Sequence, residues 1–491
     1  MPIASSTHVG IAQISVIPLE VVDARLNWFT LRSNPQRKAA DKMSDFTTSD
    51  DLALAAFHRA ATRVPAYRVL LEEAAIHPEN IRTLADFARL PVLEKQNTFQ
   101  RFSIEQLCLD GSVGRLGSVL TSSGHSGIFA YGLNEADAFQ GTVQWIDDLL
   151  DMLFAVRSRP TLLINCLPMG VKVSTQACTL AETSVRPDMA VGLVKAFQKH
   201  FSQIILVGEA AFVKFLLETG QQAGIDWPGH VTHVILGEEP LAENARTYLE
   251  RILGIDPRRP ETGIVCSSMG VGEIGLNLFS EVPPVAPLIM LRRALHGDAH
   301  LREAVLGPVD WVPSLFTYDP SRIFVEFDAN GRMILTTLDS RLRLPLIRYA
   351  TGDCGSLLRL QPHLQSAIEN AGISWESLEG VPIVTIQGRG HHAAAAGTKV
   401  YPEAVKEGIY FDPDMARLTT ANFRLVSGHE RVRIRIQLSP GVIPKPEIEK
   451  GFNDAISRYV RGSFDVACEP YETFGSGMTL DYERKFDYLG R

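Results

Sequence analysis

Short apolar runs followed by helix-period segments fill the first half of the chain. The apolar runs are Ser118–Leu120, Thr161–Asn165, Gln203–Val207 and His233–Leu236. Apolar residues at helical spacing follow them, for example over Ala210–Gly220 and Leu241–Leu253. Buried strands that alternate with helices are typical of an α/β fold with a largely parallel sheet. We therefore predict an α/β core.

Before these runs the pattern is helical. Residues 50–76 predict amphipathic helices interrupted at Pro65. Thr83–Phe87 has the signature of a short capped helix, and Leu90–Leu93 contains a proline that favours an extended connector. This part of the chain is expected to pack helices against the core.

The pattern changes after about residue 323. Two alternating runs flank Asn330 and Gly331, which predicts a β-hairpin and a β-rich subdomain. Beyond Gly388 we expect a small α+β domain. It would contain a helix beginning within Val400–Glu407, a strand over Arg431–Leu438 and a helix over Pro446–Tyr459, with four alanines at 393–396 in a loop. The predicted organisation is an N-terminal extension (1–45), a core (46–388) and a mobile lid domain (389–491).

Composition narrows the class of protein. The chain has 491 residues, a net charge of −8 and 45% hydrophobic residues, which is typical of a soluble enzyme and argues against a nucleic-acid or membrane partner. Its six cysteines form no Cys-x-x-Cys pair, and the start of the sequence lacks a signal-peptide pattern. We expect a cytoplasmic location.

A hydroxyl- and glycine-rich segment, Thr121–Gly127, follows a predicted strand. Glycines let successive backbone N–H groups converge on an anion, and the hydroxyls add donors, so the segment fits the phosphates of ATP. A polar surface turn would have the same composition. No Gly-Lys-Ser/Thr follows, so this is not a Walker A loop.

Two further segments each place a carboxylate after glycines. In Cys266–Glu273, Glu273 could bind Mg²⁺ through its oxygens, or it could be a solvated residue after a turn. In Leu344–Asp353, Asp353 could accept the hydroxyls of a ribose, or it could cap the next element.

The last part of the chain adds basic candidates. Arg389 could contact ribose or phosphate, whereas His391 and His392 are a poor match to a zinc site and fit hinge or surface positions better. Lys485 could neutralise charge on the α-phosphate if a mobile domain carried it there. An ordinary surface lysine is the alternative.

Taken in order, these segments resemble the acyl-adenylate-forming superfamily, and most of all its phenylacetate–CoA ligase-like branch. The resemblance covers roughly residues 50–491, and its most specific piece is Tyr349–Asp353. Further similar segments are Val64–Arg68, Ile76–Glu79, Thr83–Phe87, Leu90–Lys95 and Gly237–Pro240.

The resemblance implies an AMP-forming acid ligase that uses ATP and Mg²⁺. It implies catalytic roles for Lys485 and for Glu273, which would bind Mg²⁺, and a hinge at His391. The implied nucleotide contacts are Thr121, Ser122, Ser123, Gly124, Ser126, Gly127, Gly237, Glu238, Glu239, Pro240, Met269, Gly270, Asp353 and Arg389.

The chain departs from the family at several of these positions. His125 replaces a threonine, Met269 replaces an aromatic residue, and His391 replaces an acidic or lysine hinge. The altered hinge and the alanines at 393–396 leave the use of CoA open while adenylation is retained. The three replacements also keep a non-catalytic nucleotide-binding homologue as an alternative.

We expect a small, aromatic or short branched acid as the substrate. The expected pocket lining is Leu167, Met169, Val171, Lys172, Val173 and Phe212. The acceptor could be CoA or another group, in secondary metabolism such as antibiotic biosynthesis, and a homodimer is left open. Two alternatives remain: an enzyme of the same scaffold that activates nitrite or acylates a protein thiol, and a non-catalytic nucleotide-binding homologue.

Overall fold

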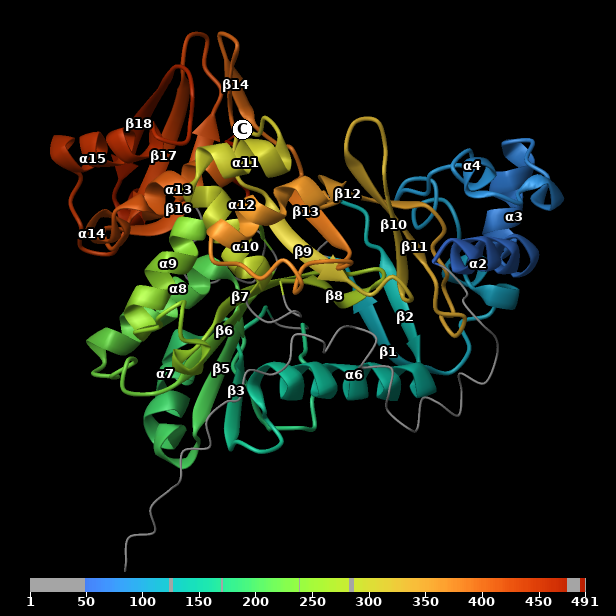
Figure 1. Ribbon diagram of the computed structural model, residues 1–491, viewed down its shortest axis with the longest axis horizontal. Coiled ribbons are helices and arrows are strands. Elements are labelled where there is room, and N and C mark those ends of the chain that lie inside the picture. The colour runs from blue at the N-terminus through green and yellow to red at the C-terminus, as the bar shows by residue number, and fades with distance from the viewer. Residues whose placement is uncertain are drawn as a thin grey trace, which may run out of the picture.

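The computed structural model describes residues 49–122, 127–168, 171–237, 239–281, 287–474 and 486–490. One large mixed sheet runs through its centre (Figure 1). Its eleven strands are, in spatial order, β10 (Ile323–Phe327), β11 (Arg332–Thr337), β12 (Tyr349–Leu358), β13 (Ile383–Gly388), β9 (Ser314–Tyr318), β8 (Gly275–Ser280), β7 (Val265–Val271), β6 (Thr232–Leu236), β5 (Gln203–Gly208), β3 (Thr161–Asn165) and β4 (Thr179–Glu182).

The sheet changes character at β7. Strands β4, β3, β5, β6 and β7 pair in parallel, whereas every pairing from β7 to β10 is antiparallel. The predicted α/β part and the predicted β-rich part therefore share one continuous sheet. β7 lies where the pairing changes from parallel to antiparallel, and the Cys266–Glu273 segment runs along this strand into the turn that follows it.

Helices cover both faces of the parallel part, as the continuous apolar runs require. Leu162, Ile164, Ile204 and Leu206 point into a core with α7 (Pro187–Phe197), α8 (Ala210–Gln222) and α9 (Glu243–Leu253). On the other face, Leu163, Ile205 and Val207 pack against α6 (Ala136–Phe154). Successive residues along β3 and β5 thus point to opposite faces of the sheet, and each face is covered by a different layer of helices.

The N-terminal helices confirm the prediction from residues 50–76. α2 (Ser49–Arg63) and α3 (Pro65–Glu73) are separated at Val64, and α4 (Leu84–Phe87) has the reciprocal capping box of Thr83 and Asp86. These helices lie at one end of the molecule beside β10 and β11 (Figure 1).

The remaining elements complete this frame. β1 (Leu116–Thr121) and β2 (Tyr131–Glu135) form an antiparallel pair. The other described helices before the C-terminal region are α5 (Ile104–Leu107), α10 (Pro287–Gly297), α11 (Ala299–Leu306) and α12 (Gln365–Asn370). Among the described helices, none has the length and apolar character needed to cross a bilayer.

The C-terminal region has its own three-stranded sheet of β16 (Thr419–Val426), β17 (Val432–Leu438) and β18 (Phe464–Glu469), with helices α13 (Pro402–Phe411), α14 (Pro413–Ala416) and α15 (Pro446–Ile456). Two details differ from the sequence prediction. The first three of the four alanines form a short strand, β14 (Ala393–Ala395), paired with β15 (Thr398–Val400). The helix α15 ends three residues early, at Ile456, whereas α13 begins at Pro402, inside the predicted Val400–Glu407 segment.

This region shares one hydrophobic core with α7, α8 and α9. Val405 and Ile409 of α13 lie in the same buried cluster as Ala245 and Leu249 of α9. The Glu407 carboxylate accepts hydrogen bonds from the first backbone N–H groups of α9, at 2.8 and 3.0 Å, and so caps that helix from another part of the chain. The C-terminal region is therefore firmly seated against the core in this arrangement.

Candidate active site

Glu273 is the centre of the candidate site. It lies in the turn after β7, is 7% exposed, and its Oε1 accepts a hydrogen bond from the Tyr349 hydroxyl at 2.9 Å. The Lys95 ammonium lies 2.9 Å from the same oxygen. Burial and the neighbouring carboxylate both raise the pKa of Tyr349, so its hydroxyl stays protonated and donates. Three distant segments of the chain thus meet at one carboxylate.

The connector that carries Lys95 is held along β12. Leu93 forms a parallel bridge with Tyr349, in which the Leu93 N–H donates to the Arg348 carbonyl and the Leu93 carbonyl accepts from Ala350. The Arg348 guanidinium donates to the carbonyls of Ala88 and Leu90 at 2.6 Å. The extended connector predicted around Pro91 is therefore confirmed, and it places Lys95 beside the start of β12.

The base of the predicted phosphate loop touches the Glu273 turn. A Cβ on Gly272 would lie only 3.0 Å from the Thr121 carbonyl oxygen and 3.1 Å from the Ser122 Cα. Gly132, on the partner strand, approaches the Glu273 backbone just as closely. Only glycine allows this approach of the two backbones. Thr121 and Glu273 are therefore neighbours, as the sequence interpretation requires.

The two ends of that loop are fixed to each other. The Ser122 N–H donates to the Ala130 carbonyl, and its hydroxyl accepts from the Ala130 N–H at 3.0 Å. Gly127 has φ +76°, which glycine adopts without strain. The predicted contacts Ser123, Gly124 and Ser126, with His125, lie outside the described residues.

Asp353 lies four residues beyond Tyr349 on β12, directly after Gly352, whose φ is +87°. Arg389 follows the end of β13, the neighbouring strand, and its Nε lies 3.8 Å from Asp353 Oδ1. One strand therefore links the Glu273 carboxylate to the Asp353 and Arg389 pair.

The Gly237–Pro240 loop follows β6 and lies beside β7 and the end of β13. Gly237 approaches the carbonyl of Ser268 on β7, and Pro240 lies against Gly388, the residue before Arg389. Glu239 is ion-paired with Lys406, so its carboxylate is already engaged. Glu238 lies outside the described residues.

Met269 and Gly270 have visible structural roles in the β7–β8 hairpin. Gly270 lets the hairpin close, because a Cβ there would lie 2.9 Å from the Gly275 carbonyl oxygen. The Met269 side chain packs on the cluster beneath the antiparallel part of the sheet. Their contact with adenine or the acyl group stays a prediction.

The expected acyl pocket is corrected at two positions. Phe212 is fully buried in the core with α7 and α9, so it does not line an open pocket. The Lys172 side chain is 71% exposed and lies 3.8 Å from Glu182, so it is a surface cation. Leu167 and Val173 pack on the α6 side of the sheet, and Met169 lies outside the described residues.

Two basic predictions are not decided by the geometry. Lys485 lies outside the described residues, and His391 keeps its hinge role only as a prediction. His392 contacts its own turn through Nδ1 and the Gly390 carbonyl at 3.0 Å. Within the described ranges, no group of three or more His, Cys, Asp or Glu side chains could hold a metal ion.

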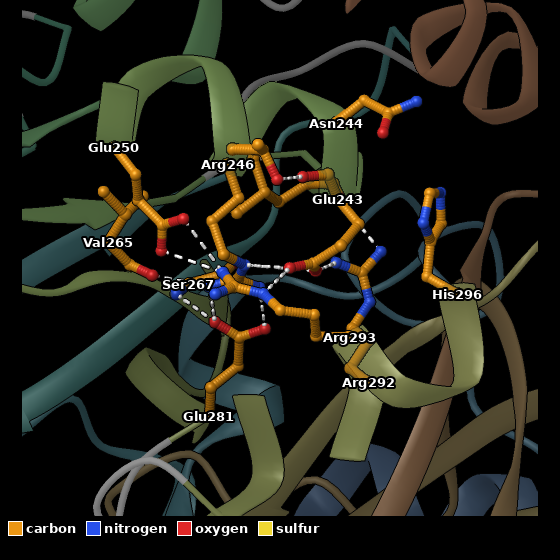
Figure 2. Close-up of polar contacts among 12 residues, drawn as sticks. Glu243, Asn244, Arg246, Glu250, Val265, Ser267, Glu281, Arg292, Arg293 and His296 are labelled. Carbon is orange, nitrogen blue, oxygen red and sulfur yellow. Dashed lines mark hydrogen bonds and ion pairs between the residues drawn. The ribbon is translucent and has the colours of Figure 1, made fainter. Parts of the chain in front are cut away.

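A buried network of charges contacts β7 at Val265 and Ser267 (Figure 2). Arg246 is fully buried between Glu243 and Glu281, and Glu281 accepts from the backbone N–H of Ser267 at 2.6 Å. Arg292 and Arg293 of α10 complete the shell around Glu243, at 2.8 and 3.2 Å. The network connects α9, α10 and β7, the strand that carries Met269 and leads into the turn of Glu273.

Comparisons with known proteins find similar chains, although no family model matches this one. A phenylacetate-coenzyme A ligase of Aromatoleum evansii is 24% identical over 439 residues, which cover 84% of this chain and 87% of that protein. A phenylacetate-coenzyme A ligase of Escherichia coli (strain K12) is 22% identical over 315 residues, covering 61% and 64%.

Solved structures show the same fold. A 2-hydroxyisobutyryl-CoA ligase in the postadenylation state, in complex with R3-HIB-AMP, gives a TM-score of 0.62 at 13% identity and covers 89% of this chain and 87% of that one. Its open conformation, with 2-HIB-AMP and CoA, gives 0.51 over 90% of each chain. The solved structures show that the fold is shared, and the sequence matches support an AMP-forming acid ligase.

Within that class, the chain is related to the phenylacetate–CoA ligase-like branch of the acyl-adenylate-forming superfamily. The expectation from the sequence is confirmed at this level. Sequence reasoning did not predict that Lys95 and the Tyr349 hydroxyl both contact the Glu273 carboxylate. Both residues stand inside segments that carried the resemblance, which was the available signal.

Proposed function

We propose that the protein activates a small carboxylic acid with ATP, forming an acyl-adenylate and releasing pyrophosphate. The observation that carries this proposal is the junction at Glu273. There the phosphate-loop base at Thr121 and Ser122 packs against Gly272, in the turn that carries the buried Glu273 carboxylate, and β12 leads from that carboxylate to Asp353 and Arg389. Phosphate, metal and ribose contacts would thus fall in the order that one nucleotide needs.

In the proposed step, an oxygen of the substrate carboxylate attacks the α-phosphorus of ATP. The bond from that phosphorus to the bridging oxygen breaks, and pyrophosphate leaves with the electron pair. Because such transfers ask for little covalent chemistry from the protein, the chain would act by positioning and by charge. Asp353 would hold the ribose, and Lys485 would face the α-phosphate.

The residues present fit a divalent cation at Glu273. Its carboxylate is a hard oxygen donor, it is buried, and the Tyr349 hydroxyl fixes its orientation. Bound Mg²⁺ would neutralise phosphate charge. Lys95, which now compensates Glu273, supplies a second positive charge at the same place. The carboxylate is therefore charge-compensated before a metal arrives.

The finer parts of the proposal concern substrate and acceptor. We propose an aromatic or short branched acid, since Leu167 and Val173 give the expected pocket wall an apolar character and the exposed Lys172 adds no charge inside. We propose CoA as the acceptor, with a protein thiol as the competing acceptor. In the same-scaffold alternative the enzyme would activate nitrite in place of the acid. Ala393 and Ala395 are buried, so that strand offers an acceptor little beyond its backbone.

The test is acid-dependent release of pyrophosphate from ATP, measured over a panel of aromatic and short acids with CoA, nitrite and thiols. Asp353→Ala and Lys485→Ala should abolish the release, whereas Lys450→Ala, an exposed lysine paired with Asp454, should leave it unchanged. Wild-type rates in both site variants would overturn the assignment. Tight ATP binding without turnover on any acid would favour the non-catalytic alternative.

A further inference from the structure

A buried polar cluster lies between the Gly237–Pro240 loop and the C-terminal region. Glu239 Oε2 accepts from the Lys406 ammonium of α13 at 2.5 Å and from the Tyr488 hydroxyl at 2.9 Å. The Lys406 ammonium also lies 4.4 Å from the centre of the Tyr488 ring. One carboxylate of the loop thus holds both a helix and the end of the chain.

Lys406 is the charge that makes the cluster stable. Burial alone would lower its pKa, but Glu239, Glu403 and Glu209 raise the pKa of Lys406 above its usual value. Glu209 is itself fixed, because its carboxylate caps α8 by accepting from the N–H groups of Ala211 and Phe212 at 3.0 Å. One ammonium is therefore ion-paired with Glu239 and lies close to two further acidic side chains, which come from both sides of the interface.

Tyr488 is anchored through its backbone as well. Its carbonyl accepts from the Leu425 N–H at 2.7 Å, and the Gly490 N–H donates to the Leu425 carbonyl at 2.8 Å, so residues 488–490 add to the edge of β16. Because the backbone on both sides of Leu489 is bonded to β16, the Tyr488 hydroxyl is held in place to donate to Glu239. The cluster is also next to the candidate site, since Pro240 contacts Gly388 and Gly237 approaches β7.

From these contacts we propose that Lys406 and Tyr488 are positioning residues for the nucleotide. They act through Glu239 and hold Gly237, Glu239 and Pro240 in one arrangement relative to β7 and Arg389. The inference rests on the proposed function, because the resemblance implies that these residues contact the nucleotide. Neither residue needs to touch the substrate. Their loss should weaken ATP binding and leave the binding of the acid unchanged.

The decisive variant is Tyr488→Phe, which keeps the aromatic ring and its packing but removes the donor to Glu239. Hydrogen bonds to charged groups are strong enough that we expect the KM for ATP to rise about tenfold. The KM for the acid should stay within about twofold of the wild type. Lys406→Arg should retain more ATP affinity than Lys406→Met, because it keeps the positive charge.

Tyr459→Phe is the matched control. Its hydroxyl accepts from Asn244 of α9 at 2.8 Å, so it is a tyrosine hydroxyl of the same interface bonded to a helix rather than to the 237–240 loop. Its KM for ATP should remain at the wild-type value. An unchanged KM for ATP in Tyr488→Phe, or an equal rise in Tyr459→Phe, would overturn the proposal. A fall in melting temperature without a change in KM would do the same, since it shows a structural role alone.

Failure of the proposed function gives a different result. In that case the wild type releases no pyrophosphate with any acid, and titration calorimetry with ATP replaces the kinetic readout. A tenfold weaker Kd for ATP in Tyr488→Phe would then still support the positioning role. An unchanged Kd would refute it. If Lys406→Met does not fold, the Tyr488→Phe measurement decides alone.

Discussion

Glu243→Gln tests the buried network behind β7 most directly. Glu243 is 2% exposed, and its carboxylate contacts Arg246, Arg292 and Arg293. Burial alone would raise its pKa, but the three guanidinium groups lower the pKa of Glu243 to about 2. The amide of glutamine keeps the shape and one acceptor while it removes the charge.

The magnitude follows from proton linkage. The ordinary value for glutamate is 4.5, so the folded protein holds this carboxylate ionised over a pH range about 2.5 units wider than the unfolded chain does. At about 1.4 kcal/mol per unit, this corresponds to about 3 kcal/mol of stability at neutral pH. Because the folded pKa is lowered, the contribution is present above pH 4.5 and is lost as the pH falls toward 2.

The assay is urea unfolding followed by tryptophan fluorescence and far-UV circular dichroism, at pH 7 and at steps down to pH 3. We expect Glu243→Gln to lower the free energy of unfolding by about 3 kcal/mol at pH 7. The gap to the wild type should narrow in acid. Glu376→Gln, which removes an exposed carboxylate, is the control and should change nothing. Equal stability at pH 7, or a gap that persists unchanged to pH 3, would refute the reasoning.

Two further predictions concern other parts of the site. Burial, with a smaller effect of Glu239, raises the pKa of Glu403 to about 7 despite the opposing effect of Lys406. Wild-type stability should therefore fall as the pH rises from 4.5 to 7. Glu403→Gln should reduce that slope in melting temperatures from about pH 5 to 8 without removing it, because burial also raises the pKa of the neighbouring Glu209 to about 7; parallel slopes would contradict this. Gly272→Ala should lower kcat/KM for ATP at least tenfold in the pyrophosphate assay, because its Cβ would meet the Thr121 backbone at 3.0 Å. The control is Gly192→Ala, which has open space, and wild-type kinetics in Gly272→Ala would rule out the close contact as a requirement.

Local patterns predicted those elements whose residues are close in sequence. β3, β5, β6 and the β10–β11 hairpin were predicted within a residue of their ends because each combines an apolar run with a clear stop signal. The strand β14 was missed, since alanine has a low strand propensity and only its pairing with β15 makes it a strand.

Contacts between distant segments could not be predicted in the same way. Tyr349 and Glu273 are 76 residues apart, and Glu239 and Lys406 are 167 apart. Nothing in the local composition distinguishes such residues from surface residues. Lys172 and Phe212 show that local patterns are also insufficient for the expected acyl pocket. The apolar pattern around them did not reveal that Lys172 faces the solvent and that Phe212 faces the hydrophobic core.

The shared core of α9 and α13 has a consequence for how the protein is made. The apolar faces of α8 and α9 leave the ribosome well before the residues that cover them, because α13 begins at Pro402 and β16 at Thr419. A chain that stops early would leave those faces in water, with the α9 N-terminus uncapped. Premature termination should therefore yield insoluble product, and separate production of residues 46–388 should need a solubilising partner.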